Sequence, residues 1–199
     1  MKRIISTVVL AFAFYSGFAQ ELKVGDKAPT FTLTNVDDKS VSLEDYSNKK
    51  GVIVIFTCNH CPYAKAYEDR IIALQTKHGA NFPVIAINPN DATEYPDDSF
   101  ENMKIRAKEK AFNFPYLHDQ SQETAKAYGA KKTPHVYLLT KTADGFVISY
   151  IGAIDDNYTD ASKVKEKHVE NAITAVESGK KVSTNFTAAV GCAIKWKKK

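Results

Sequence analysis

The sequence predicts an α/β domain whose mixed central sheet is flanked by helices, and two patterns carry this prediction. Apolar runs rich in β-branched residues alternate with amphipathic stretches that are long enough to form helices. A helical stretch separates the first two core strands, which should therefore run parallel. Only a short turn separates the last two strands, which should run antiparallel. Because one chain contains both kinds of connection, the sheet should be mixed.

The N-terminal part of the domain is predicted to be a β-hairpin that precedes the core. Residues 31–34 alternate apolar and polar side chains, and residues 35–39 supply a polar turn. Val41 and Leu43 continue the second strand, and residues 42–46 are expected to form one helical turn.

The core is predicted to begin with residues 51–56, an apolar run typical of a buried strand. A helix is expected over residues 62–78, with Pro62 in its first turn, where the missing N–H costs little. Residues 82–87 form the next buried strand.

An insertion is expected after this second core strand. Residues 88–99 form a polar loop whose last residues can cap a helix over 100–110. Residues 114–117 are extended, and a helix over 121–128 ends at Gly129.

The last core elements are two strands and a helix. The strands are expected over residues 135–139 and 146–151, with turn residues at 143–145 between them. The helix is expected to start at Asp160 or Ser162 and to reach about Ser178.

Residues 1–19 are predicted to be a secretory signal peptide. Lys2 and Arg3 precede an apolar stretch that is too short to span a membrane, and small residues at Gly17 and Ala19 precede a cleavage site before Gln20. Residues 20–199 should then form one domain outside the cytoplasm. The leader fits a bacterial one, which favours the periplasm.

The net charge of +4 lies mainly at the ends of the chain. Without residues 1–19 and the four lysines of 195–199, 21 basic and 23 acidic residues remain, so the body of the domain is close to neutral.

Two classes of function gain no support from the composition. Basic residues and aromatics do not interleave in a patch that would bind nucleic acid, and no further apolar segment approaches the length of a transmembrane helix. The basic C-terminal tail is expected to be solvated and frayed.

The chemical signal of the chain is Cys58-Asn59-His60-Cys61, which lies between a predicted strand and a predicted helix. A Cys-x-x-Cys pair at such a junction is typical of reversible dithiol–disulfide chemistry. The helix N-terminus favours a thiolate at Cys58, and Cys61 is close enough to attack a mixed disulfide formed by Cys58. Both cysteines are therefore predicted to be catalytic, and His60 between them is predicted to stabilise the Cys58 thiolate and to tune the potential.

A second signal is Thr133-Pro134, which precedes the strand at His135. In folds of the thioredoxin type, a proline at this place has a cis peptide bond and faces the dithiol. A cis bond would place the Thr133 backbone next to Cys58, where an extended substrate peptide can pair with it. Thr133 and Pro134 are accordingly predicted to orient the substrate.

These motifs give the chain a resemblance to a known group. The stretches that carry it are residues 56–63, 87–92, 95–99, 114–117, 127–130 with 133–134, and 191–196. The chain resembles the thioredoxin superfamily, and within it the redoxin or peroxiredoxin-like branch related to alkyl hydroperoxide reductase and thiol-specific antioxidant proteins. The resemblance implies a thioredoxin-like fold and thiol–disulfide redox activity, with Asn59 and His60 at the position that sets the potential.

The chain departs from the usual sequence of that group at several positions around the dithiol. Thr57 stands where thioredoxin-type reductases usually carry Trp, and residues 52–56 offer no buried acidic proton acceptor. Proton handling would then fall to water, to His60 or to a group brought close by folding. The peroxidatic Pro-x-x-x-Thr-x-x-Cys loop is absent, because Thr57 directly precedes Cys58.

The sequence therefore predicts an exported thiol–disulfide oxidoreductase that needs no cofactor. Its partners would be a protein or small-molecule disulfide and a thiol electron donor, and the sequence leaves its oligomeric state open. Three alternatives stay open: a thiol peroxidase that uses Cys58, a copper or zinc carrier that uses Cys58, Cys61 and a histidine (His60 or His135), and a redox-inactive binding module.

The third cysteine, Cys192, lies in an apolar stretch near the C-terminus. It could pair with a cysteine of another molecule, act as a third redox thiol with a regulatory or resolving role, or be a buried, inert thiol. The neighbouring apolar residues are expected to dock against the body of the domain.

Overall fold

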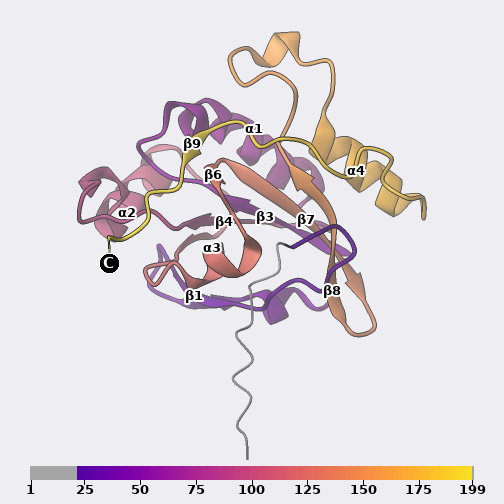
Figure 1. The fold of residues 1–199 in the computed structure, drawn as a ribbon, viewed down its shortest axis with the longest axis horizontal. Coiled ribbons are helices and arrows are strands. Elements are labelled where there is room, and N and C mark those ends of the chain that lie inside the picture. Colours follow the sequence, from indigo (N-terminus) through magenta and orange to yellow (C-terminus); the bar gives the residue numbers. More distant parts are fainter. Residues whose placement is uncertain (1–21, 199) are drawn as a thin grey trace, which may run out of the picture.

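The computed structural model describes residues 22–198, and its centre is a seven-stranded mixed sheet with the strand order β2-β1-β5-β4-β3-β7-β8 (Figure 1). The predicted signal peptide lies outside the described residues. No helix among residues 22–198 is long and apolar enough to cross a membrane. The strands of this sheet are β1 (Thr32–Asn35), β2 (Ser40–Ser42), β3 (Gly51–Phe56), β4 (Val84–Asn88), β5 (Tyr116–His118), β7 (His135–Thr142) and β8 (Gly145–Gly152).

The strand directions confirm the predicted mixed sheet. β3 runs parallel to β4 and antiparallel to β7, and β7 and β8 form the expected antiparallel hairpin. β1 and β2 form the N-terminal hairpin, and β1 pairs with β5 at the end of the insertion. This is a thioredoxin-like sheet with an added hairpin and an insertion after its second core strand.

The helices lie on both faces of the sheet, as Figure 1 shows. They are α1 (Pro62–His78), α2 (Phe100–Glu109), α3 (Glu123–Tyr128) and α4 (His168–Glu177), and short 3₁₀ turns cover Leu43–Tyr46, Pro96–Asp98 and Ala161–Lys163. The bounds of α1 agree with the prediction, because a proline begins it and Gly79 follows its last residue. The helical turn expected over 42–46 is also present.

The helix expected from Asp160 or Ser162 to Ser178 is wrong in its first half. Residues before His168 form a loop that closes on Asp156. The carboxylate of Asp156 accepts a hydrogen bond from the Lys165 N–H at 3.0 Å, and its own N–H donates to the Glu166 carbonyl at 3.1 Å. These hydrogen bonds engage backbone N–H and C=O groups that a helix starting at Asp160 or Ser162 would need for its first turns. The helix α4 therefore starts later than predicted.

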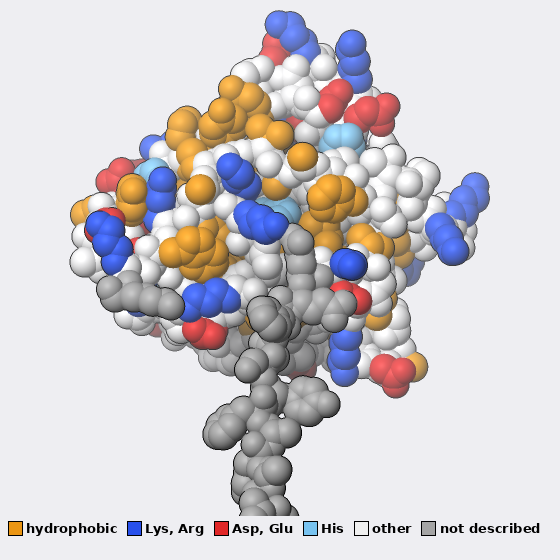
Figure 2. Space-filling view, in the orientation of Figure 1, with side chains coloured by type: hydrophobic (Ala, Val, Ile, Leu, Met, Phe, Trp, Pro, Cys, Tyr) orange, Lys and Arg blue, Asp and Glu red, His pale blue; other side chains and the backbone are white. Residues whose placement is uncertain are grey.

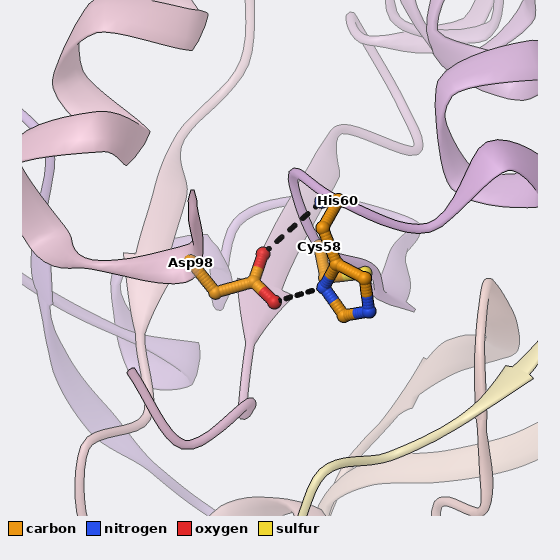
Figure 3. A group of neighbouring side chains, drawn as sticks. All are labelled: Cys58, His60 and Asp98. Carbon is orange, nitrogen blue, oxygen red and sulfur yellow. Dashed lines mark hydrogen bonds and ion pairs between the residues drawn. The ribbon is translucent and has the colours of Figure 1, made fainter. Parts of the chain in front are cut away.

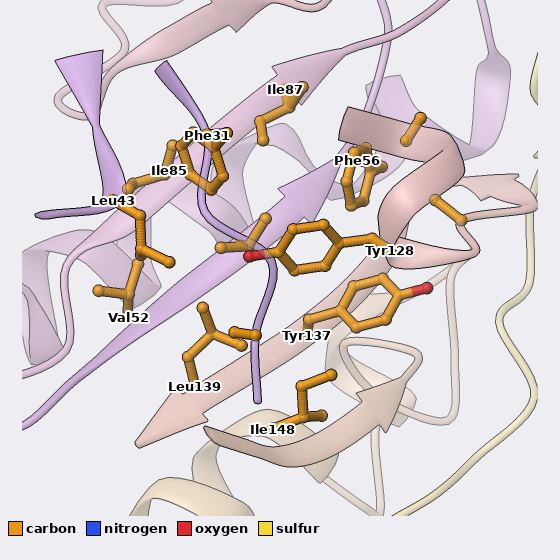
Figure 4. Close-up of a cluster of buried hydrophobic side chains, with 14 of the residues drawn as sticks. Phe31, Leu43, Val52, Phe56, Ile85, Ile87, Tyr128, Tyr137, Leu139 and Ile148 are labelled. Carbon is orange, nitrogen blue, oxygen red and sulfur yellow. The ribbon is translucent and has the colours of Figure 1, made fainter. Parts of the chain in front are cut away.

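Two apolar layers hold the helices to the sheet. On one face, side chains from α1, α2 and α4 pack on Ile53 and Ile55. On the other face, α3 and the 3₁₀ turn after β2 cover the remaining core side chains of β3 and β4. Figure 4 shows this second layer, with Phe31, Leu43, Val52, Phe56, Ile85, Ile87, Tyr128, Tyr137, Leu139 and Ile148 labelled. Because β3 is buried on both faces, its C-terminal end is a rigid support for whatever follows it.

A second, two-stranded sheet lies apart from the first. It pairs β6 (Lys132–Thr133) with β9 (Cys192–Ala193) in antiparallel register, with Thr133 opposite Cys192. The sequence pattern predicts neither strand, because each has only two residues. This small sheet brings the C-terminal segment to the end of β3.

Candidate active site

The dithiol lies where β3 ends and α1 begins. The Thr57 N–H still donates to the Ile87 carbonyl of β4 at 2.8 Å, so the sheet fixes the residue before Cys58. Cys61 is the N-cap of α1, and Pro62 follows as its first residue. Both thiols are buried, with Cys58 3% exposed and Cys61 fully covered. The sequence prediction of a strand–dithiol–helix junction is therefore confirmed.

Thr133 faces both thiols. The Thr133–Pro134 peptide bond is cis, as expected. The Cys58 sulfur lies 3.2 Å from the Thr133 hydroxyl, and the Cys61 sulfur lies 3.2 Å from the Thr133 carbonyl oxygen. The residue before the proline thus contacts the two sulfur atoms through two different groups.

Asp98, which the sequence analysis missed, lies beside the loop that carries Cys58 and His60 (Figure 3). Its carboxylate accepts the Asn59 N–H at 2.6 Å and the side-chain amide of Asn90 at 2.8 Å, and it pairs with Nδ1 of His60. Asp98 is fully buried. It belongs to the insertion, within the stretch 95–99, and no spacing rule relates that stretch to the cysteines. Its position 10 residues beyond the end of β4 gives it no signal in the sequence.

Asn59 and His60 do not play the same part. The Asn59 side chain donates to the Asp97 carbonyl at 2.7 Å and accepts from the Tyr116 hydroxyl at 2.9 Å, so it anchors the loop. The His60 ring stacks on Tyr95 at a centroid distance of 5.1 Å, and one ligand atom of His60 lies within 4.8 Å of the Cys58 sulfur. The His60 ring is therefore close enough to act on the dithiol electrostatically. Asn59 can affect the dithiol only by fixing the conformation of the loop.

Cys192 lies against the dithiol. Its sulfur is 2.6 Å from the sulfur of Cys61, and all three cysteines are free thiols. Its side chain is half-buried and packs on Cys58, Cys61 and Ala64 together with Tyr63. The docking expected for this apolar stretch is present, since Ile194 is only 4% exposed. Residues 196–198 are exposed, as expected of a solvated tail, but they are not frayed, because the Lys197 N–H donates to the Gln122 side chain at 2.8 Å and Lys198 pairs with Glu94.

The three sulfur atoms differ in their pKa values. Hydrogen bonds from the Cys58 thiol, and then from Cys192 and two backbone N–H groups, lower the pKa of Cys61 to about 4. The hydrogen bond to Cys61, together with burial, raises the pKa of Cys58. Burial and the same neighbour raise the pKa of Cys192 to about 11. In this reduced arrangement the stabilised thiolate is on Cys61, whereas the sequence analysis placed it on Cys58.

Cys58, His60 and Asp98 also form a group whose ligand atoms lie within 4.8 Å of one another and could hold a metal ion. The Asp98 oxygens, however, already accept from several donors of the loop. His135, the other histidine considered as a ligand, lies elsewhere, with its Nδ1 3.4 Å from the Lys131 nitrogen and from the Tyr137 hydroxyl. Burial lowers the pKa of His135 to about 4.

The sheet, the dithiol at the start of α1 and the facing cis proline define an oxidoreductase of the thioredoxin fold. Residues 24–157 match the AhpC/TSA family, and the chain belongs to that family.

Individual relatives are similar over most of the chain. An uncharacterized conserved protein from Geobacillus kaustophilus has a crystal structure that matches with a TM-score of 0.82 and 37% identity, over 89% of this chain and 94% of that one. The thiol-disulfide oxidoreductase ResA of Bacillus cereus is 26% identical over 75% of this chain and 85% of its own length. A putative peroxiredoxin of Mycobacterium tuberculosis is 29% identical over 64% of this chain and 76% of its own length.

Proposed function

We propose that the protein is an exported thiol–disulfide oxidoreductase that reduces disulfide bonds through Cys58 and Cys61. The observation that carries the proposal is the contact of both thiols with Thr133: the hydroxyl of this residue binds Cys58 and its carbonyl oxygen lies against Cys61, each at 3.2 Å. The residue before the cis proline thus holds the two sulfur atoms together, at the strand edge with which an extended substrate peptide is expected to pair.

The first step uses the proton that the two thiols share. As Cys58 attacks one sulfur of a substrate disulfide, its proton passes to the Cys61 thiolate. The bond between Cys58 and the substrate forms, the substrate S–S bond breaks, and the departing sulfur takes the proton from Cys61.

In the second step, the Cys61 thiolate attacks the sulfur of Cys58 in the mixed disulfide. The second substrate sulfur leaves as a thiolate and takes a proton from water. The substrate has gained two electrons, and the enzyme holds a Cys58–Cys61 disulfide. A thiol electron donor must then reduce that disulfide before the next cycle.

Export is part of the proposal and rests on residues 1–19 alone. A basic start, a short apolar stretch and small residues before Gln20 are the features that support it. Expression of the whole chain in a bacterium, with fractionation and mass analysis of the N-terminus, tests it. We expect periplasmic protein that starts at Gln20, and retention of Met1 in the cytoplasm would contradict export.

The activity is tested by insulin-disulfide reduction with metal-free protein that starts at Gln20. We expect turnover in the wild type, loss in Cys58→Ser, and in Cys61→Ser a mixed disulfide that accumulates without turnover, because the second thiol is missing. Lys65→Gln, an exposed change in the same helix, should behave as the wild type.

Turnover that survives both cysteine substitutions would contradict the mechanism. The same proteins are tested with hydrogen peroxide, because the putative peroxiredoxin among the relatives makes peroxidase the second candidate. Peroxide consumption that needs Cys58 but not Cys61, without insulin reduction, would assign the protein to that class instead.

A further inference from the structure

The segment after α4 returns across the molecule, passes the dithiol at β9 and ends on the side where α2 lies (Figure 1). We call residues 186–198 the C-terminal strap. Ile194 anchors it in the apolar core, and the Lys195 carbonyl accepts from the Asp91 N–H and from the Gln122 side chain, each at 2.8 Å. The strap is therefore a docked element of the fold.

The strap occupies the strand edge next to the cis proline. Cys192 pairs with Thr133 in β9 and β6, and the Ile194 N–H donates to the Lys131 carbonyl at 3.1 Å. This is the edge where an extended substrate peptide is expected to pair. Gly191 permits the close approach, because a Cβ atom there would lie 2.3 Å from the Thr133 carbonyl oxygen.

The strap places Cys192 as the outermost of three sulfur atoms. Cys61 is fully buried and contacts both other cysteines, Cys58 is 3% exposed, and Cys192 alone is partly open to solvent. The face that the strap crosses carries hydrophobic side chains with basic side chains between them (Figure 2). A soluble thiol that approaches this face can reach Cys192 before it can reach Cys58 or Cys61.

We propose that Cys192 is a third redox thiol, which takes over the disulfide from Cys58 by forming a Cys61–Cys192 bond and presents it to the thiol electron donor. The proposal rests on the proposed function, since that reaction produces the Cys58–Cys61 disulfide with which the step begins.

The step is an internal thiol–disulfide exchange. The Cys192 thiolate attacks the sulfur of Cys61, the Cys61–Cys192 bond forms, the Cys58–Cys61 bond breaks, and Cys58 leaves as a thiolate that takes up the proton lost by Cys192. The protein keeps the same number of electrons. A donor dithiol then attacks Cys192, forms a mixed disulfide, and resolves it with its second thiol, so that the donor is oxidised and all three cysteines are reduced.

The charges around Cys192 favour this exchange only after the dithiol has been oxidised. In the reduced protein, burial raises the pKa of Cys192 first, and its hydrogen bond to Cys61 and the Cys61 charge raise it further. Oxidation of Cys61 removes both effects of that neighbour, whereas Lys195 and Lys132, which lower the pKa of Cys192, remain. Cys192 is therefore easier to deprotonate when its attack is needed.

Disulfide mapping after trypsin tests the proposal, because the cleavage sites separate the partners. Cys58 and Cys61 share the tryptic peptide 51–65, and Cys192 lies in the peptide 182–195. The protein that starts at Gln20 is oxidised with one equivalent of diamide, blocked with N-ethylmaleimide and digested without reductant. We expect a fraction of the wild type to carry the two peptides as one disulfide-linked species.

Single substitutions assign the bond. Cys58→Ser, or Cys58→Ala if the serine variant does not fold, should form the linked species almost completely, since Cys61 then has only Cys192 as a partner. Cys61→Ser should form it little, because only Cys61 contacts Cys192 at bonding distance. The linked species in monomeric protein on a non-reducing gel supports the proposal, and its absence from folded Cys58 variants overturns it.

A kinetic measurement separates this proposal from the proposed function. Cys192→Ser should slow reduction of the oxidised enzyme by dithiothreitol about tenfold, because the accessible sulfur is lost, while the exposed neighbour change Ala193→Ser leaves it unchanged. If the wild type forms Cys58–Cys61 and reduces insulin but Cys192→Ser is reduced as fast as Ala193→Ser, Cys192 is not a relay and the proposed function stands. If the wild type forms no Cys58–Cys61 disulfide, the proposed function itself fails.

Discussion

At the residue scale, Asp98 places a buried carboxylate near the dithiol, whereas the central strand contains none. The sequence shows no carboxylate in residues 52–56, and this departure suggested a group brought close by folding. Folding brings the buried carboxylate of Asp98 to the loop that carries the dithiol, where it accepts the Asn59 N–H and pairs with the His60 ring. The dithiol motif could be recognised from its spacing, but a partner 37 residues beyond Cys61 could not, because only the packing of the insertion brings it there.

Asp98→Asn is expected to lower the free energy of unfolding by about 2 kcal/mol. The amide keeps one acceptor oxygen, so the donors on the other oxygen lose their acceptor and all the donors lose the negative charge. Urea denaturation measures the change. Asp97→Asn is the matched control, because that neighbouring side chain is exposed, and equal losses in the two variants would contradict the assigned role.

The thiolate of the reduced site should titrate with the pKa of Cys61. Since hydrogen bonds lower this pKa to about 4, one thiolate is present at neutral pH and is lost only as the pH falls through about 4. Ultraviolet absorbance of the thiolate measures the transition. Cys58→Ala should raise its midpoint more than Cys192→Ala, because the bond from Cys58 has the largest effect. A low midpoint that persists in Cys61→Ala would place the thiolate elsewhere.

At the scale of elements, the sequence patterns identified helices and strands that have a local signal. They missed the elements whose formation depends on residues far away in the sequence. The strand over 51–56 and the helix over 62–78 were predictable, because an apolar run and a proline-capped amphipathic stretch identify them locally. β6 and β9 have two residues each and lie about 60 residues apart, so their pairing has no local signature. The late start of α4 has a similar cause, because the bonds made by Asp156 depend on how the loop folds back.

Gly191→Ala is expected to lift the strap from the cis-proline edge, since its new methyl group would collide with the Thr133 carbonyl. Alkylation of the covered dithiol by iodoacetamide should then become about tenfold faster, as a buried thiol gains access to solvent. Mass analysis of the tryptic peptide 51–65 over time measures it. Ala193→Gly, an exposed change in the same strap, is the control, and equal rates in the two variants would contradict the view that close packing at Gly191 keeps the site closed.

At the scale of the whole molecule, both apolar layers converge on β3, so the same strand organises the core and ends at the dithiol. The fold class was predictable, because the order of strands and helices leaves few right-handed, unknotted topologies. The closed state of the site was not predictable, because it arises from the pairing of β9 in the C-terminal strap with β6. The strand directions of a mixed sheet follow from the lengths of its connections. The docking of a terminus cannot be predicted in this way, because it depends on a surface that forms only when the rest of the chain has folded.

Removal of metal ions should leave the insulin-reducing activity unchanged. The proposed chemistry passes electrons only between sulfur atoms, so dialysis against a chelator removes nothing that it needs. A zinc ion held by Cys58, His60 and Asp98 would instead occupy the attacking sulfur. Added zinc is therefore expected to inhibit, with recovery on chelation. Activity that is lost with the chelator and restored by the metal would contradict the metal-free mechanism.

The pairing of β9 with β6 also affects the selection of partners. A polypeptide that is to pair with Thr133 competes with a strand of the same chain, which is present at an effective concentration on the order of millimolar or more. Its apparent affinity is therefore reduced by the fraction of molecules in which the edge is free. Disulfides that bind loosely should therefore be reduced slowly, and a partner that binds well must recover the lost affinity through contacts elsewhere on the surface. Competition from β9 thus favours partners that make additional contacts with the surface of the protein.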